Sequence, residues 1–117
     1  MDKTILLCDG DSQLKDIYKD ALQDEPIEIV GCAEPDKVRT LALNLKPDLI
    51  LLNTEFDKNG YKICKLLKQN RHTLMLPILM LSDAPNVEQR QRAMEAGAID
   101  LIPVSYTHLR AHETDSY

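Results

Sequence analysis

"LILLNTE", residues 49–55, is a run of four apolar residues that stops at a polar group. An uninterrupted apolar run of this length is typical of a strand that is buried on both faces, as in a parallel sheet. The predicted strand ends at Asn53, where a carboxylate would offer more chemistry than an amide. The residues before and after this stretch decide how Asn53 is to be interpreted.

Similar apolar runs recur along the chain. They predict five strands, over residues 4–8, 27–31, 49–53, 78–82 and 98–102. The intervals carry apolar residues at helical spacing and predict helices that begin after Asp11 or Ser12, near Pro35, after Gly60 and after Asn86. Asn86 and Gln89 form a capping-box pattern at the last of these starts. Strand and helix alternate throughout, which predicts an α/β fold with a doubly wound, five-stranded parallel sheet.

Length and composition restrict the function classes. The 117 residues suffice for one domain, and the net charge of -5 argues against direct nucleic-acid binding. No apolar run approaches the roughly 20 residues needed to span a membrane, and the first residues lack the basic lead of a signal peptide. We therefore expect a cytoplasmic domain with protein partners. Cys8, Cys32 and Cys64 form no Cys-x-x-Cys pair and are expected to be buried free thiols.

Sheets of this type bind ligands beyond the carboxyl ends of their strands, next to the reversal in strand order. That rule selects Asp9, Gly10, Asp11, Asn53, Thr54, Glu55, Ser82, Asp83, Pro103 and Val104. The candidate site therefore combines carboxylates, one amide and one hydroxyl.

Residues 3–103 resemble the receiver domains of bacterial two-component response regulators. The segments that carry the resemblance, in the family's order, are ILLCDGDS (5–12), KPDLILLN (46–53), GYKICKLLK (60–68), LPILMLSD (76–83) and AMEAGAID (93–100). The resemblance implies the flavodoxin-like strand order 2-1-3-4-5. It also implies a signalling role in a phosphorelay, with a histidine kinase or an output domain as partner.

The family's chemistry, as the resemblance implies it, is phosphoryl transfer to an aspartate beside a magnesium ion. Asp9 matches the first acidic position, but Gly10 stands at the second and Asn53 at the phosphoacceptor. An amide oxygen is uncharged and a poor nucleophile, so Asn53 cannot form the acyl phosphate. Ser82 matches the switch hydroxyl, whereas Leu101 replaces the switch aromatic residue.

We therefore predict a pseudo-receiver that is not an enzyme and signals by protein contacts without phosphorylation. No cofactor is expected; magnesium would bind weakly, through Asp9. The competing interpretation, which we favour, is that Asp11 caps the first helix and Asp9 is a solvated residue at its positive end. Two alternatives stay open: a working receiver that is phosphorylated with magnesium on Glu55 or Asp57, or the regulatory domain of a larger protein with a lost output domain.

The loop and helix after Asn53 also depart from the family. The loop TEFDKNGY (54–61) lacks the family's proline and is one residue short, so its backbone carbonyl is not assured as a metal ligand. A row of lysines predicts a solvated helical face, with a partner surface as the less favoured interpretation; its members are Lys58, Lys62, Lys65 and Lys68. Gly97 predicts a close approach of a helix to a strand.

The last residues change in character. VSYTHLRAHETDSY (104–117) carries no apolar stripe, although the family has a fifth helix here, so that helix is doubtful. The segment resembles the translation of a sequencing adapter. We therefore predict a receiver-like domain over residues 1–103 and a non-native or truncated tail over residues 104–117. On this interpretation, the absence of the family's lysine–proline pair at Val104 and Ser105 is uninformative.

Overall fold

The computed structural model describes residues 3–11 and 13–104. Its strands are β1 (Lys3–Cys8), β2 (Ile27–Cys32), β3 (Leu49–Asn53), β4 (Ile78–Ser82) and β5 (Asp100–Pro103). All neighbouring strands pair in parallel, in the order β2-β1-β3-β4-β5. The predicted sheet and its strand order are confirmed. β1 and β2 each extend one residue beyond the predicted bounds, and β5 starts two residues late because the Ala98 amide donates to the Ala93 carbonyl (3.0 Å) and closes the preceding helix.

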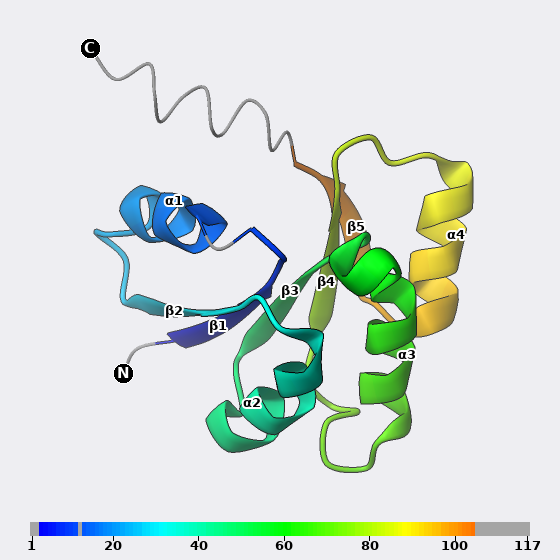
Figure 1. The fold of residues 1–117 in the computed structure, drawn as a ribbon, viewed down its shortest axis with the longest axis horizontal. Coiled ribbons are helices and arrows are strands. Elements are labelled where there is room, and N and C mark those ends of the chain that lie inside the picture. Colours follow the sequence, from blue (N-terminus) through cyan, green and yellow to red (C-terminus); the bar gives the residue numbers. More distant parts are fainter. Residues whose placement is uncertain (1–2, 12, 105–117) are drawn as a thin grey trace.

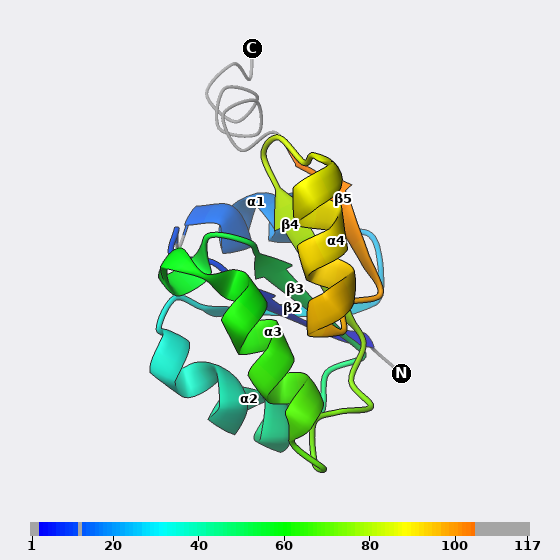
Figure 2. The same ribbon diagram turned by 90° about the vertical axis from the view of Figure 1, so that its right-hand side faces the viewer.

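The helices cover both faces of this sheet. They are α1 (Gln13–Ala21), α2 (Val38–Leu45), α3 (Gly60–Gln69) and α4 (Val87–Ala96), with short 3₁₀ turns η1 (Pro35–Lys37) and η2 (Phe56–Lys58). Figure 1 shows α1 on one face and α2 on the other, and in Figure 2 α3 and α4 lie side by side. Leu7, Leu14, Leu51 and Leu81 pack on the α1 side, whereas Leu6, Ile50, Leu52 and Met80 pack under α2, α3 and α4.

The central position of β3 explains its uninterrupted apolar run. Ile50 and Leu52 are fully buried on one face and Leu51 is 8% exposed on the other. Each such side chain stabilises the fold by about 1.5–3 kcal/mol through burial. A shift of register would turn these apolar side chains to the wrong faces of the sheet. The position of Asn53 at the carboxyl end of β3 is therefore fixed.

Two expectations about α3 are corrected. Helical spacing from Gly60 onward predicts an apolar side that includes Leu66, but Leu66 is 56% exposed and the buried face is formed by Tyr61, Cys64 and Leu67. Lys68 is not a solvated lysine like its exposed neighbours, because its Nζ donates to the carbonyls of Leu74 (3.0 Å) and Leu76 (2.8 Å).

Gly97 has a different role from the one predicted. It ends α4 in the left-handed region with φ 100°, where glycine is favoured. A Cβ atom at Gly97 would also lie 2.7 Å from Cγ of Lys68. The close approach is thus between α4 and α3, not between a helix and a strand.

Within residues 3–11 and 13–104, no helix has the length and apolar character needed to cross a membrane. The Val104 amide donates to the Ser82 carbonyl (2.8 Å), which continues the pairing at the edge of the sheet. Residues 105–117, most of the predicted tail, lie outside the described residues.

Candidate functional site

Asn53 and Asp9 meet at the carboxyl ends of β3 and β1. Leu52 and Cys8 are register partners on these strands, so the residues that follow them come side by side. The Asn53 Nδ2 group donates to Asp9 Oδ2 at 2.8 Å. The strand-end rule therefore predicted this pair correctly from residues far apart in the sequence.

The other end of the Asn53 amide is also engaged. Its Oδ1 accepts a hydrogen bond from the Glu55 backbone amide at 2.8 Å, as expected for a strand-end residue that satisfies a loop amide. A backbone N–H can only donate, so this contact assigns the oxygen to the loop and leaves the NH₂ group for Asp9. The amide is thus oriented by two partners at once.

Asp9 is a buried carboxylate. The expectation that it is solvated is wrong: it is 8% exposed. Its Oδ2 accepts from Asn53, and its Oδ1 accepts from the Asp11 backbone amide at 2.9 Å. Burying a carboxylate is costly unless donors replace its water shell, and these two donors do so.

Gly10 follows Asp9 at the position that the resemblance assigns to a second carboxylate. It is exposed, and a Cβ atom built there would meet no atom within 4 Å. Space for an acidic side chain is therefore present, and only the side chain is lacking. The neighbouring Asp11 is half-buried. The cap of α1 is predicted at Asp11 or Ser12. The Asp11 carbonyl accepts from the Leu14 amide at 3.2 Å, and Ser12 lies outside the described residues, so the assignment of the cap stays a prediction.

Ser82, at the end of β4, is buried and tied to α4. Its Oγ donates to Gln89 Oε1 at 2.8 Å. The Gln89 backbone amide donates in turn to Asn86 Oδ1 at 2.8 Å, which confirms Asn86 as the cap of α4. The capping-box pattern is thus realised in one direction, because the glutamine side chain reaches the strand instead. Sequence reasoning missed this role of Gln89, since a capping pattern predicts only local bonds.

Leu101 lies in β5 and is 2% exposed. Its side chain belongs to the core cluster beneath α2, α3 and α4. Its carbonyl accepts a hydrogen bond from Arg90 Nη1 of α4 at 3.2 Å. The position that the resemblance assigns to the switch aromatic residue thus carries a packed aliphatic side chain.

The loop after β3 closes tightly against the strand it leaves. A Cβ atom at Gly60 would lie 2.2 Å from the Asn53 carbonyl oxygen, so only glycine permits this return. The Gly60 amide donates to the Thr54 carbonyl at 2.8 Å. Asp57 sits in the loop with φ 53° and is exposed. This compact closure depends on Gly60, which the sequence marked only as the start of a helix.

A cavity of about 200 Å³ adjoins the site. Its lining residues are Asn53, Thr54, Glu55, Ser82, Asp83, Ala84 and Gln89. Of the two proposed substitute acceptors, Glu55 lines this cavity and Asp57 does not. The cavity therefore lies between the ends of β3 and β4. The strand residues that line it, Asn53 and Ser82, are neutral and polar, and its acidic residues, Glu55 and Asp83, belong to the loops that follow.

The residues present do not fit a magnesium ion. Both carboxylate oxygens of Asp9 accept hydrogen bonds, and the group that faces it from Asn53 is an NH₂ donor, not an oxygen. Gly10 supplies no ligand. Among residues 3–11 and 13–104, no three His, Cys, Asp or Glu side chains are grouped to hold a metal. Magnesium prefers several oxygen ligands in octahedral geometry, and this donor set does not offer them.

Comparison with known proteins agrees with this architecture. The family model of the response regulator receiver domain matches residues 5–111. The chain belongs to this family. It is accordingly a receiver-domain signalling module of the two-component type.

Two curated relatives show the same membership. The chain is 30% identical over 101 residues to the alkaline phosphatase synthesis transcriptional regulatory protein PhoP of Bacillus subtilis, covering 86% of this chain and 41% of that protein. It is 27% identical over 99 residues to the DNA-binding dual master transcriptional regulator RpaA of Synechocystis, covering 84% and 41%. The receiver domain thus spans about two fifths of the length of these relatives.

Solved structures share the fold. The chemotaxis response regulator CheY4 of Vibrio cholerae aligns with a TM-score of 0.80 at 19% identity, over 97% of this chain and 98% of that one. The BeF3-activated receiver domain of Klebsiella pneumoniae RstA aligns with a TM-score of 0.77 at 22% identity, over 96% of each chain. At these identities the likeness establishes the fold alone.

Proposed function

We propose that this receiver domain signals without phosphorylation at its acceptor position and acts through contacts with protein partners. The observation that carries the proposal is the double engagement of the Asn53 amide, which donates to Asp9 and accepts from the Glu55 amide. An amide in this place is neither a nucleophile nor a metal ligand, because its oxygen is directed into the loop. In this proposal the domain has no catalytic activity of its own.

The charge balance at the sheet edge supports the same proposal. Two unit charges about 4 Å apart near a protein surface repel each other by about 4 kcal/mol, and a bound cation would offset that repulsion. Here the uncharged amide of Asn53 stands in place of one of the two charges. Its hydrogen bond to Asp9 stabilises the remaining carboxylate, as a bound cation otherwise would. The site is therefore expected to be stable without an ion.

The state of Ser82 gives a second line of support. A switch hydroxyl must be available to turn toward a phosphoryl group, but this one donates to Gln89. The aliphatic Leu101, buried in the core, offers no aromatic ring to move with it. We infer that the loop between β4 and α4 keeps one conformation and presents a constant surface to partners.

The test is incubation of the chain with acetyl phosphate and magnesium, followed by intact mass measurement. The wild-type chain should gain no phosphoryl adduct of about 80 Da. The double variant Gly10→Asp/Asn53→Asp is the positive control, because it supplies both carboxylates and a Cβ atom at Gly10 meets no atom within 4 Å. An adduct that accumulates on the wild-type chain would contradict the proposal.

A second candidate is a working receiver with a substitute acceptor, favoured by the presence of Glu55 in the cavity beside Asn53 and Ser82. Glu55→Gln distinguishes it from the first. If an adduct forms on the wild-type chain and disappears in Glu55→Gln, the second candidate holds. Persistence in Glu55→Gln and loss in Asp57→Asn would instead place the acceptor at Asp57.

The kind of partner that this domain contacts is also part of the proposal. The relatives named above are longer than this chain and bear the names of transcriptional regulators. We infer that this domain works either on an attached output domain or with a histidine kinase as a separate protein. The genomic sequence on both sides of residues 1–103 tests this, since an output domain in the same reading frame would favour the first arrangement.

A further inference from the structure

Cys8 and Cys32 are direct neighbours across two parallel strands. They are the last residues of β1 and β2 and are register partners, although 23 residues separate them in the sequence. Both are free thiols, both are buried, and both belong to the core cluster beneath α2. Register partners point to the same face of a sheet, so the two side chains lie next to each other.

The spacing of parallel strands is close to what a disulfide requires. Neighbouring strands lie about 4.8 Å apart, and the Cα atoms of bridged cysteines lie about 4.4–6.8 Å apart. Bridged Cβ atoms average about 3.8 Å apart, so bond formation requires an approach of about 1 Å. β2 is an edge strand and Cys32 is its last residue, so β1 is the one strand that pairs with it there.

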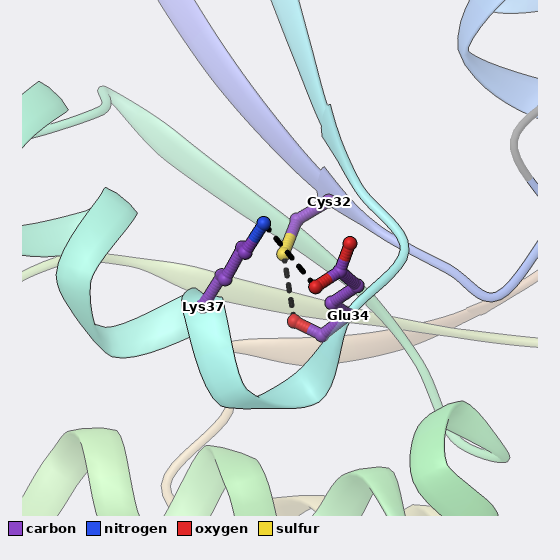
Figure 3. Close-up of polar contacts among 3 residues, drawn as sticks. All are labelled: Cys32, Glu34 and Lys37. Carbon is purple, nitrogen blue, oxygen red and sulfur yellow. Dashed lines mark hydrogen bonds and ion pairs between the residues drawn. The ribbon is translucent and has the colours of Figure 1, made fainter.

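Cys32 is also the more accessible of the pair. Its Sγ donates to the Glu34 carbonyl at 3.1 Å. Figure 3 shows that the Lys37 ammonium, which is paired with the Glu34 carboxylate at 3.2 Å, extends toward this sulfur. The side chains of that ion pair are largely exposed, so the charged groups nearest this thiol face solvent.

We propose that Cys8 and Cys32 form a reversible disulfide, a modification site that links β1 to β2 directly beside Asp9. Cys32 is the attacking thiol and Cys8 the resolving thiol. The strain expected from the required approach makes the bond readily reducible, as is typical of labile disulfides.

The oxidant is a peroxide. The Cys32 thiolate attacks one oxygen of hydrogen peroxide, the O–O bond breaks, hydroxide leaves, and Cys32 becomes a sulfenic acid. The Cys8 sulfur then attacks the Cys32 sulfur, and the S–O bond breaks with release of water. Two thiols are oxidised, one peroxide is reduced, and two waters form in total.

The surroundings of the two sulfurs determine which one reacts first. Burial raises the pKa of both thiols, so each is predominantly protonated in the folded chain. Cys32 and Asp9 raise the pKa of Cys8 further, whereas at Cys32 the Glu34 carboxylate raises the pKa and the Lys37 ammonium lowers it. Because the Cys32 side chain is also the more exposed of the two, oxidation begins there.

The test treats the reduced full-length chain with hydrogen peroxide, denatures it and alkylates it with N-ethylmaleimide. Intact mass should show one alkylated thiol where the untreated chain has three, with a loss of about 2 Da for the disulfide. Trypsin places each thiol in a separate peptide, at residues 4–15, 20–37 and 63–65. The first two should be found linked, and dithiothreitol should restore three alkylated thiols.

Matched variants assign the bond. Cys64→Ala should still form the link, and Cys32→Ser should not. The unfolded chain in guanidinium should lose the preference and yield all three pairings. Three outcomes would overturn the proposal: oxygen adducts on Cys32 without a link, a link that includes Cys64 in the folded chain, or a covalent dimer.

The role of Lys37 has its own variant. Lys37→Gln should slow formation of the link several-fold, since removal of a neighbouring cation disfavours the thiolate. Lys65→Gln, an exposed lysine of α3, is the control and should react at the wild-type rate. Equal rates in both variants would refute the role of Lys37 in activating Cys32.

Discussion

At the ends of β1 and β3 a buried carboxylate accepts a hydrogen bond from an amide, whereas at the end of β4 a hydroxyl donates to a side chain of α4. In the proposed assignment, the first region departs from the family, with Asn53 at the acceptor and Gly10 at the second acidic position. The second region keeps the family's hydroxyl in Ser82. Both are nevertheless satisfied by internal hydrogen bonds. The retention of a residue type therefore does not imply the retention of its role, because the partner of that residue decides what it can do.

The largest effect is expected from Asn53→Asp, which breaks the first region. The change removes the donor to Asp9 and places a second carboxylate against it. Repulsion at this distance is about 4 kcal/mol near a protein surface, so we expect the free energy of unfolding to fall by about 3–4 kcal/mol without magnesium. Magnesium at millimolar concentration should restore part of this loss. Urea titrations with and without magnesium measure both quantities.

Asn44→Asp is the matched control for this change. Asn44 is an exposed residue of α2, so the same substitution should alter the unfolding free energy by less than about 0.5 kcal/mol and confer no response to magnesium. An Asn53→Asp chain as stable as the wild type without magnesium would refute the importance of the bond between Asn53 and Asp9.

Alkaline pH should lower the free energy of unfolding through Cys8, which precedes Asp9 in the first region, and not through the second region. The pKa of Cys8 is raised above its ordinary value of 9.0, first by burial and then by Cys32 and Asp9. A raised folded pKa contributes stability that is complete below the unfolded pKa and is lost as the pH rises toward the folded one. Between pH 8 and pH 10 this thiol should cost about 1.4 kcal/mol of unfolding free energy. Other buried thiols add to the wild-type slope.

Cys8→Ala should reduce the loss over this pH range by about 1.4 kcal/mol, whatever its effect at neutral pH. Ser82→Ala is the comparison variant from the second region and should keep the wild-type pH dependence. Urea unfolding at four or more pH values provides the slopes. Equal slopes in the wild-type chain and Cys8→Ala would contradict the raised pKa.

These two regions also show what the sequence could and could not predict. The apolar run before Asn53 predicted a buried central strand, and the strand-end rule then placed Asp9 and Asn53 together without further information. The burial of Asp9 was not predictable, because it depends on donors that the fold supplies from another strand and from its own loop. The bond between Ser82 and Gln89 was missed for a related reason, since it joins a strand to a helix.

The pairing of Cys8 with Cys32 required the register of β1 against β2. Apolar patterns identify strands to within a residue or two, but a shift of one residue would reverse the faces of the two thiols. The predicted end of the second strand at residue 31 lay one residue short of Cys32. An error of that size was sufficient to hide the pair.

An intermediate effect is expected from Ser82→Ala and Gln89→Ala, which break the second region. Each should lower the unfolding free energy by about 1 kcal/mol, as is usual for one hydrogen bond between neutral groups. The double variant should cost less than the sum, because both changes remove the same bond. Gln91→Ala, an exposed glutamine of α4, is the control and should be close to neutral. Strict additivity of the two changes would show that the bond does not contribute.

The smallest effect on stability is expected from Gly10→Asp alone. The position is exposed and a Cβ atom meets nothing within 4 Å, so the unfolding free energy should change by less than about 0.5 kcal/mol. In the Asn53→Asp background the same change should add a carboxylate ligand and strengthen the response to magnesium, which prefers carboxylate oxygens. Thermal melts of the two single variants and the double variant, each with and without magnesium, measure this coupling. If Gly10→Asp responds to magnesium while Asn53 is retained, the amide does not exclude the ion. The absence of a carboxylate at position 10 would then be sufficient to explain why the first region does not bind magnesium.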